Sequence, residues 1–262
     1  MDLGLSGKVA LVCASSKGIG KAAAVGLAAE GAKVVICARG AEALEATEKE
    51  IRGSGAEVLA APCDVTDHEA AQALVKQAAD AFGQVDILVN NAGGPPTGAL
   101  MEHDDGAFVK ALEQNLLSTV RLTRLVVPGM RERRWGRIIN VTGMAVKEPL
   151  NDLLLSNMAR TGVVGFAKTI ATELAADNVL VNNVCPGVIL TDRQYELSRA
   201  RAKMLGITPE EELRRREQRI PMKRGGMPEE LGNLIVFLAS ERASYITGAT
   251  IQVDGGLVRG LM

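Results

Sequence analysis

Residues 11–20, Leu-Val-Cys-Ala-Ser-Ser-Lys-Gly-Ile-Gly, have the composition and spacing of a turn that binds phosphate. An apolar run at 9–13 before the turn is typical of a buried strand, and the Ala-rich segment 21–30 after it is typical of a helix. In this arrangement the first amides of the helix point toward an anion, and glycine lets the backbone approach it closely. Glycine also serves simple helix packing, so the turn indicates a pyrophosphate site only together with the rest of the chain.

A positively charged residue occupies the position that selects between a dinucleotide with a free ribose 2′-hydroxyl and one with a 2′-phosphate. The residue about 20 positions past the glycine turn meets the adenosine ribose, where an acid suits a free 2′-hydroxyl and an arginine suits a 2′-phosphate. That residue is Arg39, and no acid lies between Lys33 and Gly40. Lys17, inside the turn, adds a second cation. Either one alone could be an ordinary surface residue, but together they favour NADP(H) over NAD(H).

The elements that would position this turn alternate along almost the whole chain. Apolar runs predict strands at 9–13, 33–38, 57–61, 86–90, 137–142, 180–184 and 250–253, and helical patterns lie at about 21–30, 41–53, 67–82, 104–130, 153–176 and 228–240. Buried strands separated by helices indicate a parallel sheet covered on both faces. We therefore expect an α/β fold with one doubly wound, seven-stranded Rossmann-type sheet, residues 1–262 forming a single domain, and a ligand crevice at the carboxyl ends of the strands.

Composition excludes several classes of function. A net charge of −1 favours neither nucleic acid nor a membrane surface, and the chain has no apolar run near the roughly 20 residues of a membrane span. The first residues lack the pattern of a signal peptide, so we expect a cytoplasmic protein. The four cysteines lie in or beside predicted strands without metal-ligand spacing, which indicates buried thiols and no metal site: Cys13, Cys37, Cys63 and Cys185.

With these features in place, the chain resembles the classical short-chain dehydrogenase/reductase superfamily, and within it the 3-oxoacyl-acyl-carrier-protein reductase type. The resemblance runs nearly end to end and implies where the cofactor binds. The glycine motif corresponds to Ala14, Ser15, Ser16, Lys17, Gly18, Ile19 and Gly20, with Ala14 in place of the first glycine. The adenine-contacting segment corresponds to Asp64 and Val65, and the family's motif after the fourth strand to Asn91, Ala92 and Gly93. The nicotinamide loop corresponds to Pro186, Gly187, Val188, Ile189 and Thr191.

The same resemblance implies a catalytic serine, tyrosine and lysine, and here the sequence departs from the family. Gly143, next to Thr142, stands at the serine position, Ser156 at the tyrosine position and Arg160 at the lysine position, whereas the helix asparagine is kept as Asn115. The catalytic candidates are therefore Asn115, Thr142, Ser156 and Arg160, with Arg160 also expected to hold the nicotinamide ribose.

These replacements change the chemistry that the site can do. An aliphatic hydroxyl is a far weaker acid than a phenol of pKa about 10, and a guanidinium stays protonated. A positioned general acid contributes roughly 10²–10⁴ in rate, while positioning the reactants can contribute about 7–11 kcal/mol, so hydride transfer could survive the change. Candidate replacement acids are Tyr195, Lys147, Glu148 and His103.

Three functions remain open at this point. The first is an NADPH-dependent oxidoreductase acting on a small carbonyl, imine or alcohol with an atypical proton donor. The second is a cofactor-binding protein without redox turnover, and the third is a lyase or isomerase that reuses the crevice. Because the nicotinamide loop and Asn115 are retained, we favour the first function, the oxidoreductase.

One charged region interrupts the alternation. Residues 191–224 follow the strand at 180–184 and are poor in strand signals, so we expect a helical lid over the crevice. For the charge run within this region, a solvated surface helix is the better interpretation. The region's basic residues hint at an anionic substrate. The resemblance further implies a homodimer or homotetramer packed through the helices at 104–130 and 153–176.

Overall fold

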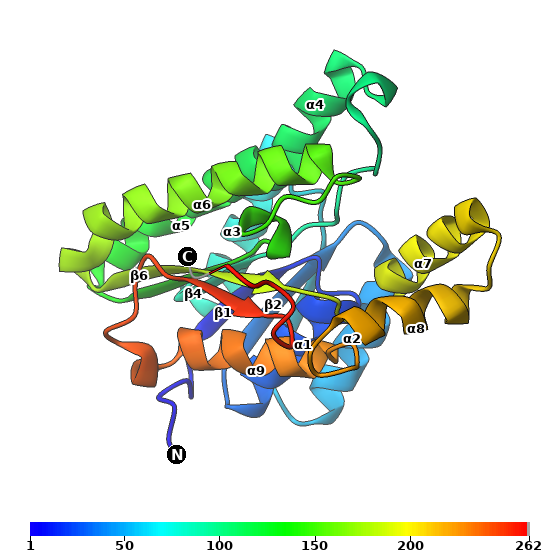
Figure 1. Ribbon diagram of the computed structural model, residues 1–262. Coiled ribbons are helices and arrows are strands. Elements are labelled where there is room, and N and C mark those ends of the chain that lie inside the picture. Colours follow the sequence, from blue (N-terminus) through cyan, green and yellow to red (C-terminus); the bar gives the residue numbers. More distant parts are fainter. Residues whose placement is uncertain (261–262) are drawn as a thin grey trace.

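Seven parallel strands form one sheet in the computed structural model, which describes residues 1–260 (Figure 1). Their order is β3-β2-β1-β4-β5-β6-β7, so the winding direction reverses between β1 and β4. The strands are β1 Val9–Cys13, β2 Lys33–Ala38, β3 Val58–Pro62, β4 Ile87–Asn90, β5 Gly136–Val141, β6 Val179–Pro186 and β7 Thr250–Val253. The predicted fold class is confirmed, and a crevice is expected where neighbouring strands lead their connections to opposite faces.

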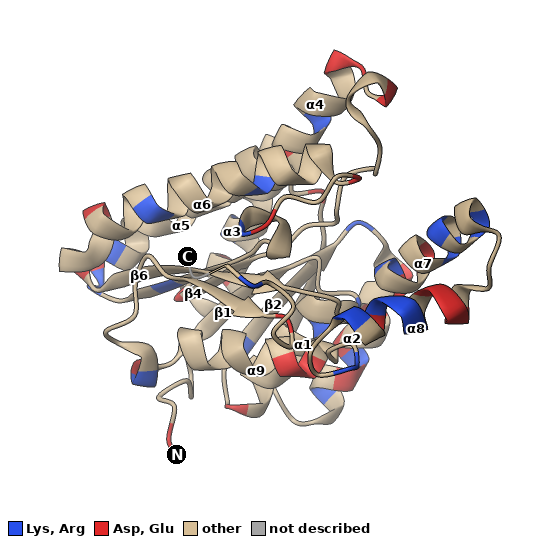
Figure 2. Ribbon diagram, viewed as in Figure 1, with Lys and Arg blue, Asp and Glu red and all other residues tan. Residues whose placement is uncertain are grey.

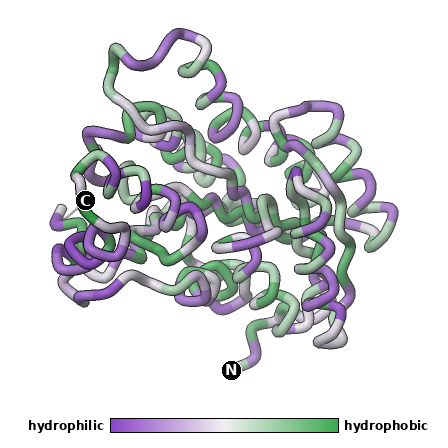
Figure 3. Tube along the Cα trace, turned by 90° about the vertical axis from the view of Figure 1, so that its right-hand side faces the viewer, coloured by the Kyte–Doolittle hydropathy of each residue, from purple (hydrophilic) through white to green (hydrophobic). Residues whose placement is uncertain are grey.

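Helices cover both faces of this sheet. The helices are α1 Gly18–Ala29, α2 Ala41–Gly53, α3 His68–Phe82, α4 Asp105–Leu112, α5 Ser118–Glu132, α6 Leu154–Leu174, α7 Asp192–Leu205, α8 Pro209–Arg219 and α9 Pro228–Ala239. One apolar core joins α1, α2 and α9 to the sheet, and a second core joins α3, α5 and α6 to the opposite face. Figure 3 shows the apolar strands inside and the hydrophilic segments outside. Burial on both faces explains why the strands are continuous apolar runs.

A ladder of polar side chains crosses four neighbouring strands of the buried sheet. Asn90, Asn140, Asn183 and Thr250 occupy paired positions on β4, β5, β6 and β7. Each amide donates to the next side chain, at 2.9, 2.9 and 3.0 Å. A shift of one residue in any strand would bury these amides without partners, so the ladder fixes the register of the strands below the cleft.

The helix predicted at 104–130 is interrupted. Between α4 and α5, residues Glu113–Leu117 form a turn of π-helix that contains Asn115. Hydroxyls of Ser118 and Thr119 donate to the carbonyls of Gln114 and Asn115 at 2.7 and 2.8 Å, and so satisfy backbone groups in the widened turn. Such a turn is frequent at functional sites and changes which side chains face the sheet.

The charged region 191–224 contains two helices, α7 and α8, which pack against each other beside the carboxyl ends of the strands (Figures 1 and 2). Thr191 begins α7 as its N-cap, accepting from the amide of Gln194. Three contacts join α7 to distant loops. Asp192 pairs with Lys17 at 3.1 Å, Arg193 donates to the Pro95 carbonyl at 3.4 Å, and Arg201 pairs with Asp152. No helix among residues 1–260 is long and apolar enough to cross a bilayer.

Candidate functional site

A cleft of about 1000 Å³ opens at the carboxyl ends of β1, β2, β4 and β5, at the point where the winding direction reverses. The cleft is large enough for a dinucleotide, and ligands of doubly wound sheets bind at this place. Most of the sequence-predicted site residues come together in its wall: Ala14, Ser16, Lys17, Gly18, Ile19, Arg39, Asp64, Val65, Asn91, Ala92, Gly93, Thr142, Arg160, Pro186 and Thr191.

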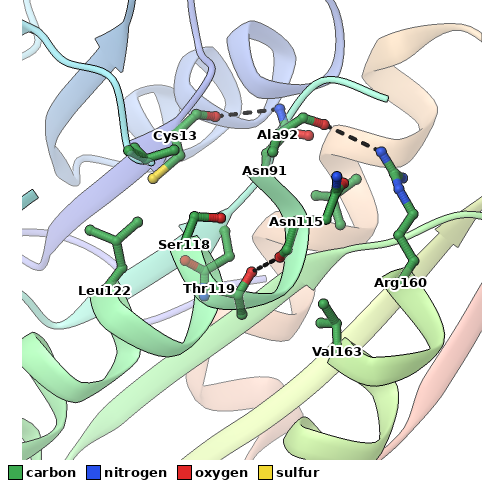
Figure 4. Close-up of a pocket in the computed structure, with 12 residues that line it drawn as sticks. Cys13, Asn91, Ala92, Asn115, Ser118, Thr119, Leu122, Arg160 and Val163 are labelled. Atoms are coloured by element: carbon green, nitrogen blue, oxygen red, sulfur yellow. Dashed lines mark hydrogen bonds between the residues drawn. The ribbon is translucent and has the colours of Figure 1, made fainter. Parts of the chain in front are cut away.

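Two residues with a left-handed backbone conformation, and one close contact between backbone segments, shape the glycine turn. Ala14 has φ +47°, and Gly18 has φ +58°. A Cβ atom at Gly20 would lie 2.3 Å from the Ala14 carbonyl oxygen, so that position requires glycine. The Asn91 side-chain amide donates to the carbonyl of Cys13 at 3.3 Å (Figure 4) and to that of Ala14 at 3.4 Å, which joins the turn to the end of β4.

Five residues predicted to contact the cofactor lie behind the cleft wall in the described part of the chain: Ser15, Gly20, Gly187, Val188 and Ile189. Ser15 is buried and accepts from the Cys37 amide at 3.0 Å, which joins β1 to β2. Gly187 packs so closely on β7 that a Cβ atom would lie 2.7 Å from the Asp254 Cβ. These residues shape the cleft by supporting its wall.

The end of the cleft beside β2 and β3 carries both charge signs. Arg39 is exposed at the end of β2, and Asp64 is exposed at the end of β3. Partial burial acts to raise the pKa of Asp64, but hydrogen bonds from the Thr66 amide and hydroxyl, together with the Arg39 charge, outweigh it and lower that pKa. Asp64 is therefore ionised at neutral pH, and Arg39 remains an exposed cation beside it.

Arg160 is the central cation at the opposite end of the cleft. Its guanidinium donates to the carbonyl of Thr142 and, at 3.3 Å, to that of Ala92 (Figure 4), and so bridges the ends of β5 and β4. Its Nε is screened from solvent and has no hydrogen-bond partner among the described residues. Burial lowers the pKa of Arg160 to about 10, and the charge of Arg193 acts in the same direction while Cys185 opposes it. The side chain therefore stays protonated at neutral pH, and its two backbone contacts leave one hydrogen on each Nη for another acceptor.

The remaining catalytic candidates surround this guanidinium without all entering the cleft. Ser156 is buried one turn before Arg160 on α6, and Asn115 is buried in the π-helical turn, where it lines a small cavity that Arg160 also borders. Thr142 lines the cleft, and its hydroxyl donates to the Val184 carbonyl at 3.0 Å. A Cβ atom at Gly143 would lie 3.5 Å from the Arg160 Nη1, so a side chain there would touch the guanidinium.

None of the candidate replacement acids is among the residues that line the cleft. Tyr195 is 43% exposed on α7. Lys147 follows the short turn after β5 and is near enough to help oppose the burial that raises the pKa of the Cys185 thiol. His103 packs edge-on against Phe108, with ring centres 6.3 Å apart.

Sequence analysis missed several cleft residues, including Asp192 and Gln114, and it grouped Arg193 only among the basic residues of the charged region 191–224 that hint at an anionic substrate. Asp192 and Arg193 follow Thr191 directly, and their place at the start of a helix after β6 was the available signal. Gln114 donates to the Gly93 carbonyl at 2.9 Å and supports the loop after β4. Among residues 1–260 there is no group of three or more His, Cys, Asp or Glu side chains placed to hold a metal ion.

Comparison with known proteins matches this geometry to one family. A family model described as Enoyl-(Acyl carrier protein) reductase matches residues 13–258. The chain is 38% identical to the 3-oxoacyl-[acyl-carrier-protein] reductase of a Synechocystis strain over 256 residues, 97% of this chain and 98% of that protein. It is also similar to L-sorbose reductase from Gluconobacter frateurii complexed with NADPH and L-sorbose, at 39% identity and TM-score 0.95 with both chains fully covered. Actinorhodin polyketide ketoreductase with NADPH, in a single-site variant, matches at 35% identity and TM-score 0.93 over 97% of this chain and 98% of that one.

Proposed function

Because the chain belongs to the classical short-chain dehydrogenase/reductase family, we propose that it is an NADPH-dependent oxidoreductase that reduces a small carbonyl compound without the usual proton donor. The observation that carries this proposal is the cleft itself. Its wall contains the glycine turn, the loop after β4, Thr191 and a protonated Arg160. The solved relatives with NADPH bound support the choice of cofactor.

The residues present fit NADP(H). The turn from Ala14 to Ile19 would hold the pyrophosphate, Arg39 the 2′-phosphate, Asp64 with Val65 the adenine, and Pro186 with Thr191 the nicotinamide. Lys17 would contribute less to the 2′-phosphate than the sequence alone suggests, since its ammonium pairs with Asp192. Bound here, the cofactor supplies a hydride to a carbonyl carbon.

Arg160 would stabilise the oxygen of that carbonyl as it gains negative charge. A fixed cation in a site screened from water is worth much more there than in solution. Its two backbone contacts use one hydrogen on each Nη, and the remaining Nη hydrogens are donors for the ribose hydroxyls or for the substrate. Ser156, on the same face of α6, would donate a hydrogen bond to the substrate oxygen instead of acting as a full acid.

We propose that α7 and α8 act as the lid of this site. The ion pair between Lys17 and Asp192 joins the lid to the glycine turn, and the pair between Arg201 and Asp152 joins it to the loop before α6. Both pairs are at least partly exposed, so each contributes little and the lid can open.

The test begins with binding. NADPH should bind about 10- to 100-fold more tightly than NADH, because hydrogen bonds to a charged phosphate are worth about 1.5–3 kcal/mol. Arg39→Asp should remove that difference, whereas Arg124→Asp, which changes an exposed arginine on α5, should leave it intact. Equal affinity of the native protein for both cofactors would contradict the assignment. NADPH consumption against a panel of ketones, aldehydes and imines then tests turnover.

A second candidate, a cofactor-binding protein without turnover, is favoured by one observation. Arg160 uses its guanidinium to bridge two backbone carbonyls, and a bridging role needs no chemistry. Tight NADPH binding with no consumption across the whole panel would select this function over the first.

We also propose that residues 1–262 act as one domain that assembles into a symmetric homodimer or homotetramer through α5 and α6. Leu125, Val127 and Ile170 on these helices are only partly buried, and Met158 is exposed. Pairing such faces is the usual way in which symmetric oligomers bury apolar surface. Sedimentation at micromolar concentration should show more than one copy, and a stable monomer would refute the assembly.

A further inference from the structure

Two guanidinium groups border the same end of the cleft. Arg160 comes from α6, and Arg193 comes from the first turn of the lid helix α7. The two side chains are near enough for the charge of Arg193 to act against the protonation of Arg160. Like charges brought together in a partly desolvated site cost free energy unless an anion joins them.

The acids of the cleft wall are engaged elsewhere. Asp192 pairs with Lys17 at 3.1 Å, Glu113 pairs with Arg121 at 2.6 Å, and Asp64 accepts from the Thr66 hydroxyl at 2.8 Å. The described contacts of the Arg193 guanidinium are the Pro95 carbonyl at 3.4 Å and, on its own helix, Glu196 at 3.6 Å. Both contacts are long, and the Arg193 side chain is 47% exposed, so the guanidinium is available to a ligand.

We propose that the substrate is an oxo acid, a carbonyl compound whose carboxylate binds Arg193 while its carbonyl oxygen lies against Arg160. A planar guanidinium binds a carboxylate through two parallel hydrogen bonds and so orients the substrate. Because Arg193 belongs to α7, binding the carboxylate also holds the lid against the cleft. This inference rests on the proposed carbonyl reduction and adds a substrate class and a specificity residue to it.

The reaction balances without a further reactant. The carbonyl carbon accepts a hydride from NADPH, and the electron pair of the C=O π bond moves to the oxygen. The oxygen takes one proton that comes ultimately from water. Oxo acid, NADPH and one proton thus give hydroxy acid and NADP⁺, and the carboxylate is unchanged.

Matched substrates test the proposal. Pyruvate, acetoacetate and levulinate are each compared with the corresponding methyl ester, in assays of NADPH consumption by the full-length protein. For at least one pair, kcat/KM should be about 10- to 100-fold higher for the acid, as expected for a hydrogen bond to a charged group. Arg193→Gln should remove that preference by lowering the value for the acid alone. Arg199→Gln, which changes an exposed arginine on the same helix, should keep it.

Two further measurements distinguish failure of the oxo-acid site from failure of the proposed reductase function. The affinity for NADPH should be equal in the native protein and in Arg193→Gln; if the variant binds NADPH more weakly, Arg193 is a cofactor contact and the proposal is wrong. Esters consumed as well as acids by the native protein would also overturn it. If none of the six compounds is reduced, the melting temperature of the NADP⁺ complex is measured with each of them. Stabilisation by the acids alone, lost in Arg193→Gln, would retain the oxo-acid site while the reductase function fails, and no such stabilisation would refute the site.

Discussion

The glycine turn allows a sharp test, since a single methyl group at position 20 would overlap the backbone that forms it. A Cβ atom at Gly20 would lie 2.3 Å from the Ala14 carbonyl oxygen, 2.8 Å from its carbonyl carbon and 2.9 Å from the Asn91 Nδ2. Two of these atoms are backbone and cannot rotate away. In Gly20→Ala the start of α1 must therefore move away from the end of β1.

The expected effect follows from the cost of overpacking. Inserting a methyl group into a packed site costs typically 1–3 kcal/mol, and we expect about 3 kcal/mol because backbone has to move. For a chain of this length each kcal/mol lowers the melting temperature by about 2–4 °C, so Gly20→Ala should melt about 6–12 °C below the native protein. NADPH affinity should fall at least about tenfold, since Ala14 and Asn91 both line the cleft.

Calorimetry and a fluorescence titration with NADPH measure the two effects. The matched control is Gly53→Ala at the end of α2, where a Cβ atom would have no described atom within 4 Å. Alanine is the better helix former, so the control should gain up to about 1 kcal/mol. If Gly20→Ala melts with the native protein and binds NADPH equally well, the turn does not have the geometry described and the reasoning is refuted.

Three other substitutions and one chemical modification give independent checks. Ala14→Gly should change the free energy of unfolding in urea by less than about 1 kcal/mol, because relief of the left-handed φ of +47° is offset by the greater entropy of the unfolded chain; a larger loss would contradict this. Arg160→Ala should weaken NADPH binding about tenfold, while Ser156→Ala should leave binding unchanged and lower turnover; the reverse pattern in titrations and initial rates would exchange their roles. Burial and the nearby Cys37 raise the pKa of the Cys63 thiol to about 12. Alkylation of Cys63 by iodoacetamide, followed by mass spectrometry, should therefore be slow at pH 8 and accelerate as the pH rises toward that pKa, and fast labelling at pH 8 would count against it.

The strands were predictable because each one is buried on both faces. The bounds predicted for β1, β2 and β7 coincide with the observed ones. For each of the other four strands, the differences at its two ends add up to between one and three residues. The difference is largest for β6, which continues to Pro186 because that residue still pairs with Val253 of β7. Pairing partners lie far away in the chain, so local pattern could not indicate this extension.

The interrupted helix and the charge pairs escaped prediction for physical reasons. Apolar periodicity continues from α4 into α5, and one widened turn at Asn115 changes the register without changing the composition. The pairing of Lys17 with Asp192 depends on where α7 lies relative to the glycine turn, which is a tertiary property. Placement of Arg160 on the cleft followed from the resemblance, whereas its bond to the Ala92 carbonyl required the fold.

The packing of α1 against α9 has a consequence for how the protein is made. α1 begins at the glycine turn, and α9 lies directly against it: a Cβ atom at Gly26 would sit 2.9 Å from Val236, and one at Gly232 would sit 3.1 Å from Ala22. The helix that follows the glycine turn is thus covered by a segment synthesised about 200 residues later, at a ribosomal rate of roughly 5–20 residues per second. Until α9 and β7 have left the ribosome, the apolar side of α1 is exposed and β6 is an open sheet edge. We therefore expect nascent chains that end before α9 to depend on chaperones and to lack affinity for the nucleotide.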